Sequence, residues 1–413
     1  MLYPTGKQRR RVISRRSGLI GLLLSAIILA LVPISGQAGP ALVFNTRTGE
    51  VLHSHGPFTP WHPASLTKLM TAYVTFRAIQ SGRITMQSPV RVSEQALAQP
   101  PSKMGFPVGT EISVEYALRI LMVKSANDIA HALAEAVGGS HDAFISQMNA
   151  SARQLGMTDT VYVNPHGLHD PRQVTTARDL ALLTSAIINN YPQHQHFFEI
   201  PSIRVGQRVL TNHNKLIGRF RGADGMKTGY VCASGFNIVA TATRGGRRLA
   251  AVVLGGMRST LRNEVTAGLL EAAFEEGTGF SLLGGSGRPT IASLPRPASI
   301  GTPVDMRPYV CQKKKAPPEY LSFGMEATTA SATDPSRSLN PSGSALALTT
   351  ASAIDLGPMA PGAKPVVAFD VPMPRPRPAD APKANSFKIF ATPSISNTPS
   401  AQNQVRPRNN PLR

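Results

Sequence analysis

The chain carries, at residues 62–70, the stretch His62-Pro63-Ala64-Ser65-Leu66-Thr67-Lys68-Leu69-Met70. Apolar residues at helical spacing continue as far as Ile79, so the pattern predicts a helix that begins near Pro63. Ser65 and Lys68 then lie on one face of that helix, where hydroxyl and amine can touch. The backbone N–H groups of a first helical turn have no partner within the helix, so they can stabilise an oxyanion. The simpler alternative is an N-terminal serine followed by an ordinary surface lysine.

Further secondary structure is predicted on both sides of this stretch. Residues 41–54 indicate a β-hairpin, and residues 114–137 form an amphipathic region interrupted at 124–128. Ser and Asn at the interruption compete with helical backbone bonding, which predicts a new helix capped near Ser125 or Asn127. The remaining predictions are a helix over 174–189, strands over 226–230, 236–243 and 249–254, and a helix over 263–275. Strands at both ends with helices between them predict an α/β fold with an antiparallel sheet.

Composition divides the chain into three parts. Residues 1–38 combine six basic residues, an apolar run and the small residues Gly36-Gln37-Ala38, which predicts an export signal cleaved after Ala38. A retained membrane anchor is the alternative, although the apolar run is short for a span. Residues 39–280 are predicted to form one folded domain. Residues 281–413 hold 21 of the 35 prolines and are predicted to be a disordered basic tail.

The net charge of +20 is concentrated at the two ends of the chain. Residues 281–413 contain fifteen basic and seven acidic residues, whereas aromatic residues make up only 6% of the sequence. A nucleic-acid partner is therefore not expected, because such binding favours a basic face with interleaved aromatics. The tail instead suggests contact with an anionic envelope or inner-membrane surface.

Cysteine and histidine usage does not indicate a metal site or a cofactor. The two cysteines, Cys232 and Cys311, can pair in an oxidising compartment, and the sequence leaves this open. Cys232 lies five residues after Lys227, and a small buried residue is the favoured interpretation over a catalytic thiol. The ten histidines lack a consistent set of partner ligands.

Three short motifs occur in order: Ser65-x-x-Lys68, Ser125-Ala126-Asn127 and Lys227-Thr228-Gly229. Together with flanks such as Asn164–Leu168 and Asp224–Tyr230, they resemble the low-molecular-mass penicillin-binding proteins. These are the serine D-alanyl-D-alanine carboxypeptidases of peptidase family S11. The resemblance covers residues 40–280 and implies a β-lactamase/transpeptidase-like fold with a five-stranded antiparallel sheet. It also implies peptidoglycan stem peptides as substrates, β-lactams as inhibitors, and a periplasmic or other extracytoplasmic location.

The resemblance assigns a role to each motif residue. Ser65 is expected to be the nucleophile, a neutral Lys68 its base, and Ser125 a proton relay to the leaving amine. Burial and the charge of Lys227 are expected to lower the pKa of Lys68. The remaining positions are implied to bind substrate or to stabilise the oxyanion: Asn127, Lys227, Thr228, Gly229, Tyr230 and Arg262.

Three other functions remain as alternatives. A class A β-lactamase is disfavoured, because no glutamate occurs between Glu135 and Glu199 to activate a deacylating water. A D,D-endopeptidase that cuts cross-links would use the same residues. A catalytically idle wall-binding scaffold is disfavoured by the intact serine and lysine set.

Overall fold

A five-stranded antiparallel sheet organises the part of the chain that the computed structural model describes, residues 39–276, 287–312 and 368–371. Its strand order is β2-β1-β9-β8-β7, so β7 occupies an edge. The strands are β1 (Ala41–Asn45), β2 (Val51–His55), β7 (Ala223–Val231), β8 (Gly235–Arg244) and β9 (Arg247–Gly256). The predicted hairpin and the three later strands are confirmed, and the two ends of the domain meet where β1 pairs with β9.

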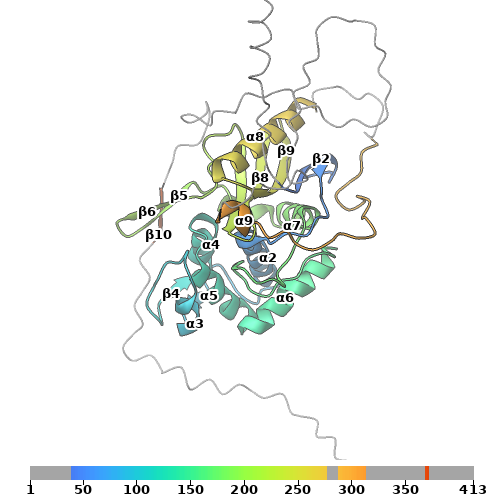
Figure 1. Cartoon of the computed structure of the whole chain (residues 1–413). Helices are drawn as coiled ribbons and strands as arrows, with labels where there is room; N and C mark the ends of the chain where they lie inside the picture. The colour runs from blue at the N-terminus through green and yellow to red at the C-terminus, as the bar shows by residue number, and fades with distance from the viewer. Residues whose placement is uncertain (1–38, 277–286, 313–367, 372–413) are drawn as a thin grey trace, which may run out of the picture. The chain divides into compact units, whose positions relative to one another are not determined.

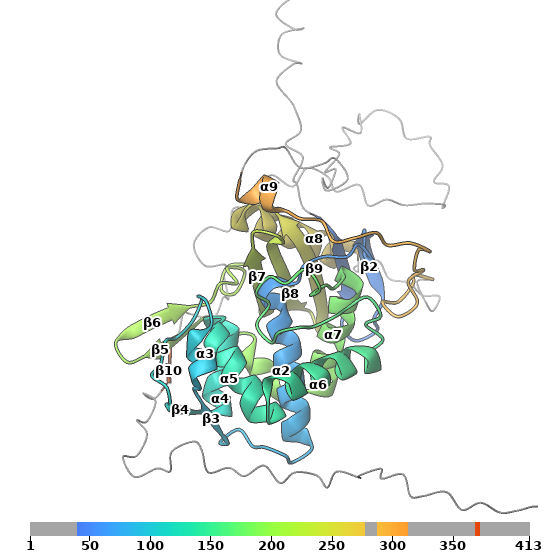
Figure 2. The ribbon, with the colours of Figure 1, turned by 60° about the horizontal axis from the view of Figure 1, so that its bottom comes forward.

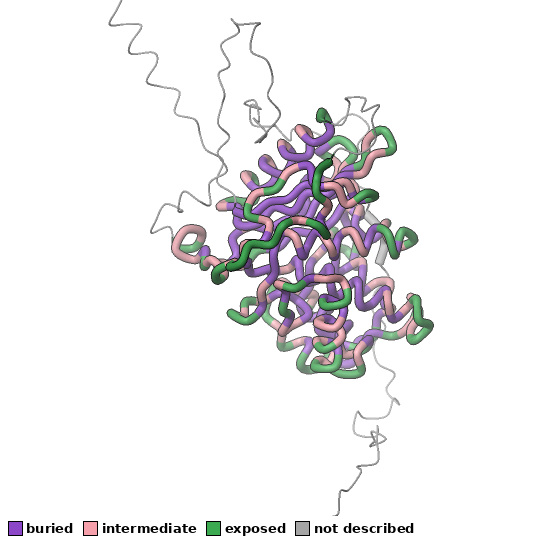
Figure 3. The backbone as a smooth tube through the Cα atoms, turned by 90° about the vertical axis from the view of Figure 1, so that its right-hand side faces the viewer, coloured by how far each residue is buried: buried purple, intermediate pink, exposed green. Residues whose placement is uncertain are grey.

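Both faces of the sheet are buried, because successive side chains of a strand point to opposite sides. In β9, Ala250, Val252 and Leu254 join the larger apolar core with the helices that follow β2. Leu249, Ala251 and Val253 pack instead in the second core with α8 (Ser259–Glu276). Figure 2 shows α8 on one side of the sheet and α2 and α7 on the other, and Figure 3 shows exposure concentrated in the connecting loops.

The helices on the larger side and the turns before them carry the first two motifs, whereas the third motif lies on β7. Figure 1 labels these helices. After the 3-10 turn η2 (Ala64–Leu66), they are α2 (Thr67–Gln80), α4 (Val114–Val123), α5 (Asn127–Gly138), α6 (His141–Gln154) and α7 (Ala177–Asn190). The predicted start of α7 at residue 174 is three residues early. Thr176 caps α7 by accepting a hydrogen bond from the Asp179 N–H, while Val174 bridges to Val161.

Several smaller elements were not predicted. They are α3 (Glu94–Ala98), η3 (Pro192–Phe197), and the pairs β3 (Pro89–Arg91) with β4 (Glu111–Ser113) and β5 (Ser202–Val205) with β6 (Arg208–Thr211). Strand β10 (Ala368–Val371) lies parallel to β5. The helix α6 was also missed, although Phe144, Met148 and Ala152 lie at helical spacing and are buried.

The predicted domain boundary at residue 280 is too early. Residues 287–312, which we call the strap, lie against the domain, and Ile291 and Met306 within it are buried. The strap contains the short helix α9 (Arg307–Val310). Together with the partly buried Leu294, Val304, Tyr309 and Val310, these two buried residues anchor to the domain a Pro-rich segment that composition alone assigned to the tail. The predicted export signal and the rest of the tail, except for β10, fall outside the described residues.

None of the helices in the described ranges is long and apolar enough to span a membrane. The same ranges contain no group of three or more His, Cys, Asp or Glu residues arranged to hold a metal ion.

Candidate active site

Ser65 lies in a tight turn rather than in the α-helix itself. Pro63 precedes the 3-10 turn η2, and α2 begins only at Thr67. Ala64 has a positive φ of 48°, a conformation that non-glycine residues rarely adopt. The predicted contact between hydroxyl and amine nevertheless forms. Lys68 Nζ donates a hydrogen bond to Ser65 Oγ at 3.0 Å.

Lys68 is fully buried, with an exposed fraction of 0%. Its amine also donates to Asn127 Oδ1 at 2.8 Å and to the His166 carbonyl at 2.6 Å. Burial and then the charge of Lys227 hold the pKa of Lys68 well below its ordinary value, against a smaller opposing effect of Asp128. A neutral amine in contact with a hydroxyl is able to accept its proton.

Ser125 and Asn127 lie at the break between α4 and α5. The predicted break and new helix are confirmed, but the cap position is Ala126, between the two residues, and no side chain caps the helix there. Ser125 instead adopts a positive φ of 60° and accepts a hydrogen bond from Lys227 Nζ at 2.9 Å. Asn127 bonds to Lys68 and donates to the Pro100 carbonyl. The break therefore directs two polar side chains toward the two lysines.

Lys227 comes from the middle of β7 and is 1% exposed. Burial and the nearby charge of Arg262 lower the pKa of Lys227 to about 7. Arg262 lies in the first turns of α8, where its guanidinium bonds to Asn263 Oδ1 and to the Asn237 carbonyl. Burial lowers the pKa of Arg262 to about 10, so this guanidinium stays charged at neutral pH.

Strand β7 passes directly against the turn that carries Ser65. A Cβ atom placed on Gly229 would lie 3.0 Å from both the Ser65 nitrogen and the Pro63 carbonyl oxygen. Such contacts are tighter than Cβ atoms normally make, so a side chain here would push β7 and the Ser65 turn apart. Tyr230 follows on the opposite face of the strand, and its ring stacks on Phe236 with the centroids 4.2 Å apart.

A cleft of about 700 Å³ opens over this arrangement. Its lining includes the predicted residues Ser65, Ser125, Asn127, Thr228, Gly229, Tyr230 and Arg262. Lys68 and Lys227 lie buried beneath it, so the structure brings the whole predicted set together. Ser65 is bonded to the amine of Lys68 and Ser125 to the amine of Lys227, and the guanidinium of Arg262 lies at the wall of the cleft.

Sequence reasoning missed other residues of the cleft, among them Ser102, Leu168, His213 and Lys215. Burial, then the charges of Lys227, Lys124 and Lys215, lower the pKa of His213 to about 4, so this imidazole is neutral at pH 7. Leu168 ends the flank Asn164–Leu168, to which no role was assigned, whereas Ser102, His213 and Lys215 belong to no motif with a fixed spacing.

The family model described as D-alanyl-D-alanine carboxypeptidase, Peptidase S11, matches residues 30–258. The chain is similar to the D-alanyl-D-alanine carboxypeptidase DacD of Salmonella typhimurium, with 37% identity over 257 residues, 60% of this chain and 66% of the relative. It is also similar to DacF of Bacillus subtilis, with 31% identity over 59% of this chain and 64% of that relative. The matches thus span about two thirds of the curated relatives' lengths.

Solved structures of penicillin-binding proteins are also similar to this chain. Penicillin binding protein 6B from Escherichia coli has 37% identity and a TM-score of 0.55, over 57% of this chain and 76% of that one. Penicillin-binding protein D2 from Listeria monocytogenes, solved in a cefotaxime-bound form, has 29% identity and a TM-score of 0.53. That match covers 57% of this chain and 97% of the Listeria chain. The predicted fold class is confirmed by these neighbours and by the antiparallel sheet.

Proposed function

Because the chain belongs to the Peptidase S11 family of D-alanyl-D-alanine carboxypeptidases, we propose that it removes the terminal D-Ala from peptidoglycan stem pentapeptides through an acyl-enzyme on Ser65. The observation that carries this proposal is the 3.0 Å hydrogen bond between Ser65 Oγ and the buried amine of Lys68. A lysine with a lowered pKa beside a hydroxyl is the activated nucleophile that acyl transfer requires.

The proposed acylation uses both lysines. Ser65 Oγ attacks the carbonyl carbon of the penultimate D-Ala while Lys68 Nζ accepts the hydroxyl proton. Backbone N–H groups of Ser65 and Tyr230 stabilise the oxyanion, and Asn127 holds the substrate amide. Lys227, Thr228 and Arg262 bind the terminal carboxylate. Ser125, bonded to Lys227, passes a proton to the departing D-Ala amine, and water then hydrolyses the ester.

β-Lactams are the proposed inhibitors, since they carry a carboxylate and a reactive carbonyl that suit the same groups. Structures of the Listeria relative in ampicillin-bound and cefotaxime-bound forms support this proposal. Export to the periplasm or another extracytoplasmic compartment is proposed as well, on the pattern of residues 1–38 and on the substrate.

Two measurements on the full chain test the function. Labelled penicillin should attach in a 1:1 ratio, and mass analysis of stem pentapeptides should show the loss of one alanine. Cleavage confined to cross-linked dimers would overturn the carboxypeptidase proposal in favour of an endopeptidase. A chain that neither labels nor cleaves would be a wall-binding protein without this chemistry.

Gly229→Ala should lower the acylation rate by about tenfold, because an added methyl group must push β7 away from Ser65. Stopped-flow labelling with a fluorescent penicillin measures this rate. Gly268→Ala is the matched control, because a Cβ at Gly268 in α8 meets nothing within 4 Å. The control should keep its activity and gain up to about 1 kcal/mol of stability. Wild-type acylation by Gly229→Ala would show that close approach is not required.

We also propose that the tail beyond the strap contacts an anionic envelope surface. Residues 313–413 contain twelve basic and six acidic residues. Removing them should leave the turnover of a small soluble peptide unchanged and weaken binding to isolated wall sacculi. Co-sedimentation should show the difference most clearly at low salt, where screening is weakest. Equal sedimentation of both forms at low salt would exclude the tail as the contact.

A further inference from the structure

The strap is attached to the domain at both of its ends and lies beyond the segment that matches the family, which ends at residue 258. At its start, the Val51 N–H donates to the Pro289 carbonyl and the Ile291 N–H donates to the Gly49 carbonyl. Arg296 then forms an ion pair with Asp159 at 2.6 Å. Most residues between Arg296 and Met306 are exposed, so the strap crosses the surface before it is held again.

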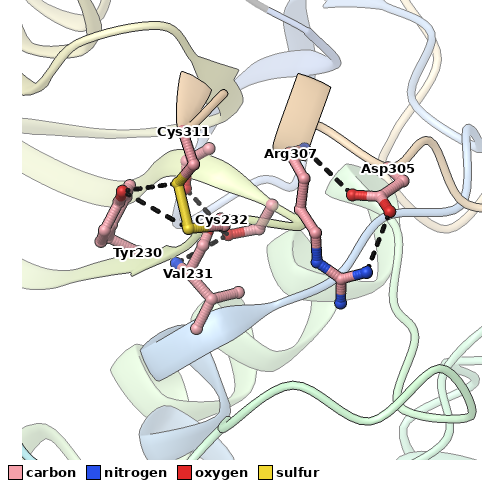
Figure 4. Close-up of a disulfide and its surroundings, with 8 residues drawn as sticks. Tyr230, Val231, Cys232, Asp305, Arg307 and Cys311 are labelled. Carbon is pink, nitrogen blue, oxygen red and sulfur yellow. Dashed lines mark hydrogen bonds and ion pairs between the residues drawn. A yellow bond between two sulfur atoms is a disulfide. The ribbon is translucent and has the colours of Figure 1, made fainter. Parts of the chain in front are cut away.

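The far end of the strap is bound to the end of β7. Met306 is 1% exposed, and its N–H donates to the Ala233 carbonyl at 3.0 Å. Cys311 forms a disulfide with Cys232, which settles the pairing that the sequence left open. Figure 4 shows the Tyr230 hydroxyl beside this disulfide, 3.3 Å from Cys311 Sγ. Cys232 itself lines the cleft.

The charged residues at this end of the strap also lie near His169. Arg307 forms an ion pair with Asp305, and both side chains are about half exposed (Figure 4). Burial, the adjacent His62 and the charge of Arg307 lower the pKa of His169. Leu168, next to His169, lines the cleft. Residues 303–312 are therefore fixed to the turn after β7 by the Met306–Ala233 hydrogen bond and the disulfide, with Arg307 near His169.

The order of groups along β7 gives the direction of a bound peptide. Its terminal carboxylate belongs near Lys227 and Thr228, and its scissile carbonyl belongs between Ser65 and Tyr230. An extended peptide advances about 3.3 Å per residue along an edge strand. The residues that precede the two terminal alanines therefore reach the level of Cys232 and the strap.

We propose that the disulfide-bound end of the strap, residues 303–312, is a specificity element that forms a subsite for the stem-peptide residues preceding D-Ala-D-Ala. This inference rests on the proposed carboxypeptidase function. A helix of four residues does not hold its place alone, so the disulfide and the buried Met306 keep this wall in position. Short acyl donors end before the strap and do not touch it.

Cys311→Ser tests the proposal with two substrates, N-acetyl-D-Ala-D-Ala and a full stem pentapeptide. For the pentapeptide, kcat/KM should fall by about five- to tenfold, mainly through a higher KM. A loss of this size corresponds to the contacts of one peptide subsite. For the acetylated dipeptide, kcat/KM should stay within about twofold of the wild type. A purely stabilising disulfide would change both substrates alike, and that result would overturn the proposal.

Reduction of the wild type provides the second arm. Dithiothreitol gives two electrons and two protons to the disulfide, yields the Cys232 and Cys311 thiols, and closes to its own cyclic disulfide. Cys311 is exposed, so the reagent can reach it. Reduction should reproduce the selective loss on the pentapeptide, and reoxidation should restore it. This arm decides the question if Cys311→Ser does not fold.

Arg296→Gln is the matched control, because it breaks the strap's ion pair with Asp159 and leaves the disulfide intact. It should preserve the ratio of kcat/KM for the two substrates, and a selective loss here would overturn the assignment to residues 303–312. A wild type that cleaves neither substrate would overturn the proposed function itself. Cleavage with an unchanged ratio in Cys311→Ser and in the reduced protein would overturn the strap proposal alone.

Discussion

Ser65→Ala should abolish covalent penicillin labelling and lower peptide turnover by about 10⁴-fold or more, because no other hydroxyl is bonded to Lys68 Nζ in the described structure. The fold should survive, since the change removes a single oxygen atom at the cleft surface. Intact-mass measurement after incubation with penicillin gives the labelled fraction, and thermal unfolding monitors the fold.

Ser102→Ala is the control for this experiment. Ser102 also lines the cleft, but its hydroxyl donates to the Lys124 carbonyl and is not bonded to an amine. Labelling of this control should continue at a rate close to that of the wild type. Stoichiometric labelling of Ser65→Ala would remove Ser65 as the nucleophile and would direct attention to Ser125.

Lys227→Gln should lower kcat/KM by about two orders of magnitude at neutral pH, since a charged hydrogen bond to the carboxylate contributes about 1.5–3 kcal/mol. The pH profile should change as well. Loss of the Lys227 charge raises the pKa of Lys68, so Lys68 becomes neutral only at higher pH and the acid limb moves upward. The basic limb near pH 7, where Lys227 itself loses its proton, should disappear.

Lys227→Arg separates the two effects. It keeps a positive charge near Lys68 and should spare the acid limb, while the broader guanidinium fits the carboxylate site less well and raises KM. Profiles of kcat/KM between pH 5 and pH 9 for the wild type and both variants provide the measurement. Wild-type values for Lys227→Gln in both rate and profile would mean that Lys227 does not act on substrate or on Lys68.

Much of the fold was predictable because the relevant signals are local. The apolar runs of β8 and β9 on either side of the glycine turn at Gly245-Gly246 identify the hairpin without any tertiary information. Most of the predicted site residues also occur in short motifs, two of which have a spacing set by one helix turn or one strand, whereas Arg262 belongs to none. The positions of Ser65 and Lys68 on neighbouring turns therefore follow from the sequence, although the turn at Ser65 proved to be 3-10.

The missed features depend on contacts between distant residues. The polar residues at the α4–α5 break were interpreted as caps, because a local rule cannot anticipate a lysine that lies 102 positions away. The strap was hidden because its few buried and partly buried apolar residues are interspersed with prolines and exposed polar residues, and the average composition of 281–413 does not register them. Cys232 and Cys311 are separated by 79 positions, and sequence spacing carries no information about such a pair.

The Cys232–Cys311 bond also closes residues 232–311 into a covalent ring. A protease that cuts once in the exposed stretch between Arg296 and Met306 opens this ring without dividing the molecule. Everything after the cut, including the basic residues of 313–413, stays joined to the catalytic domain through one sulfur–sulfur bond. A nicked chain therefore migrates as one species until a reductant separates it into two fragments.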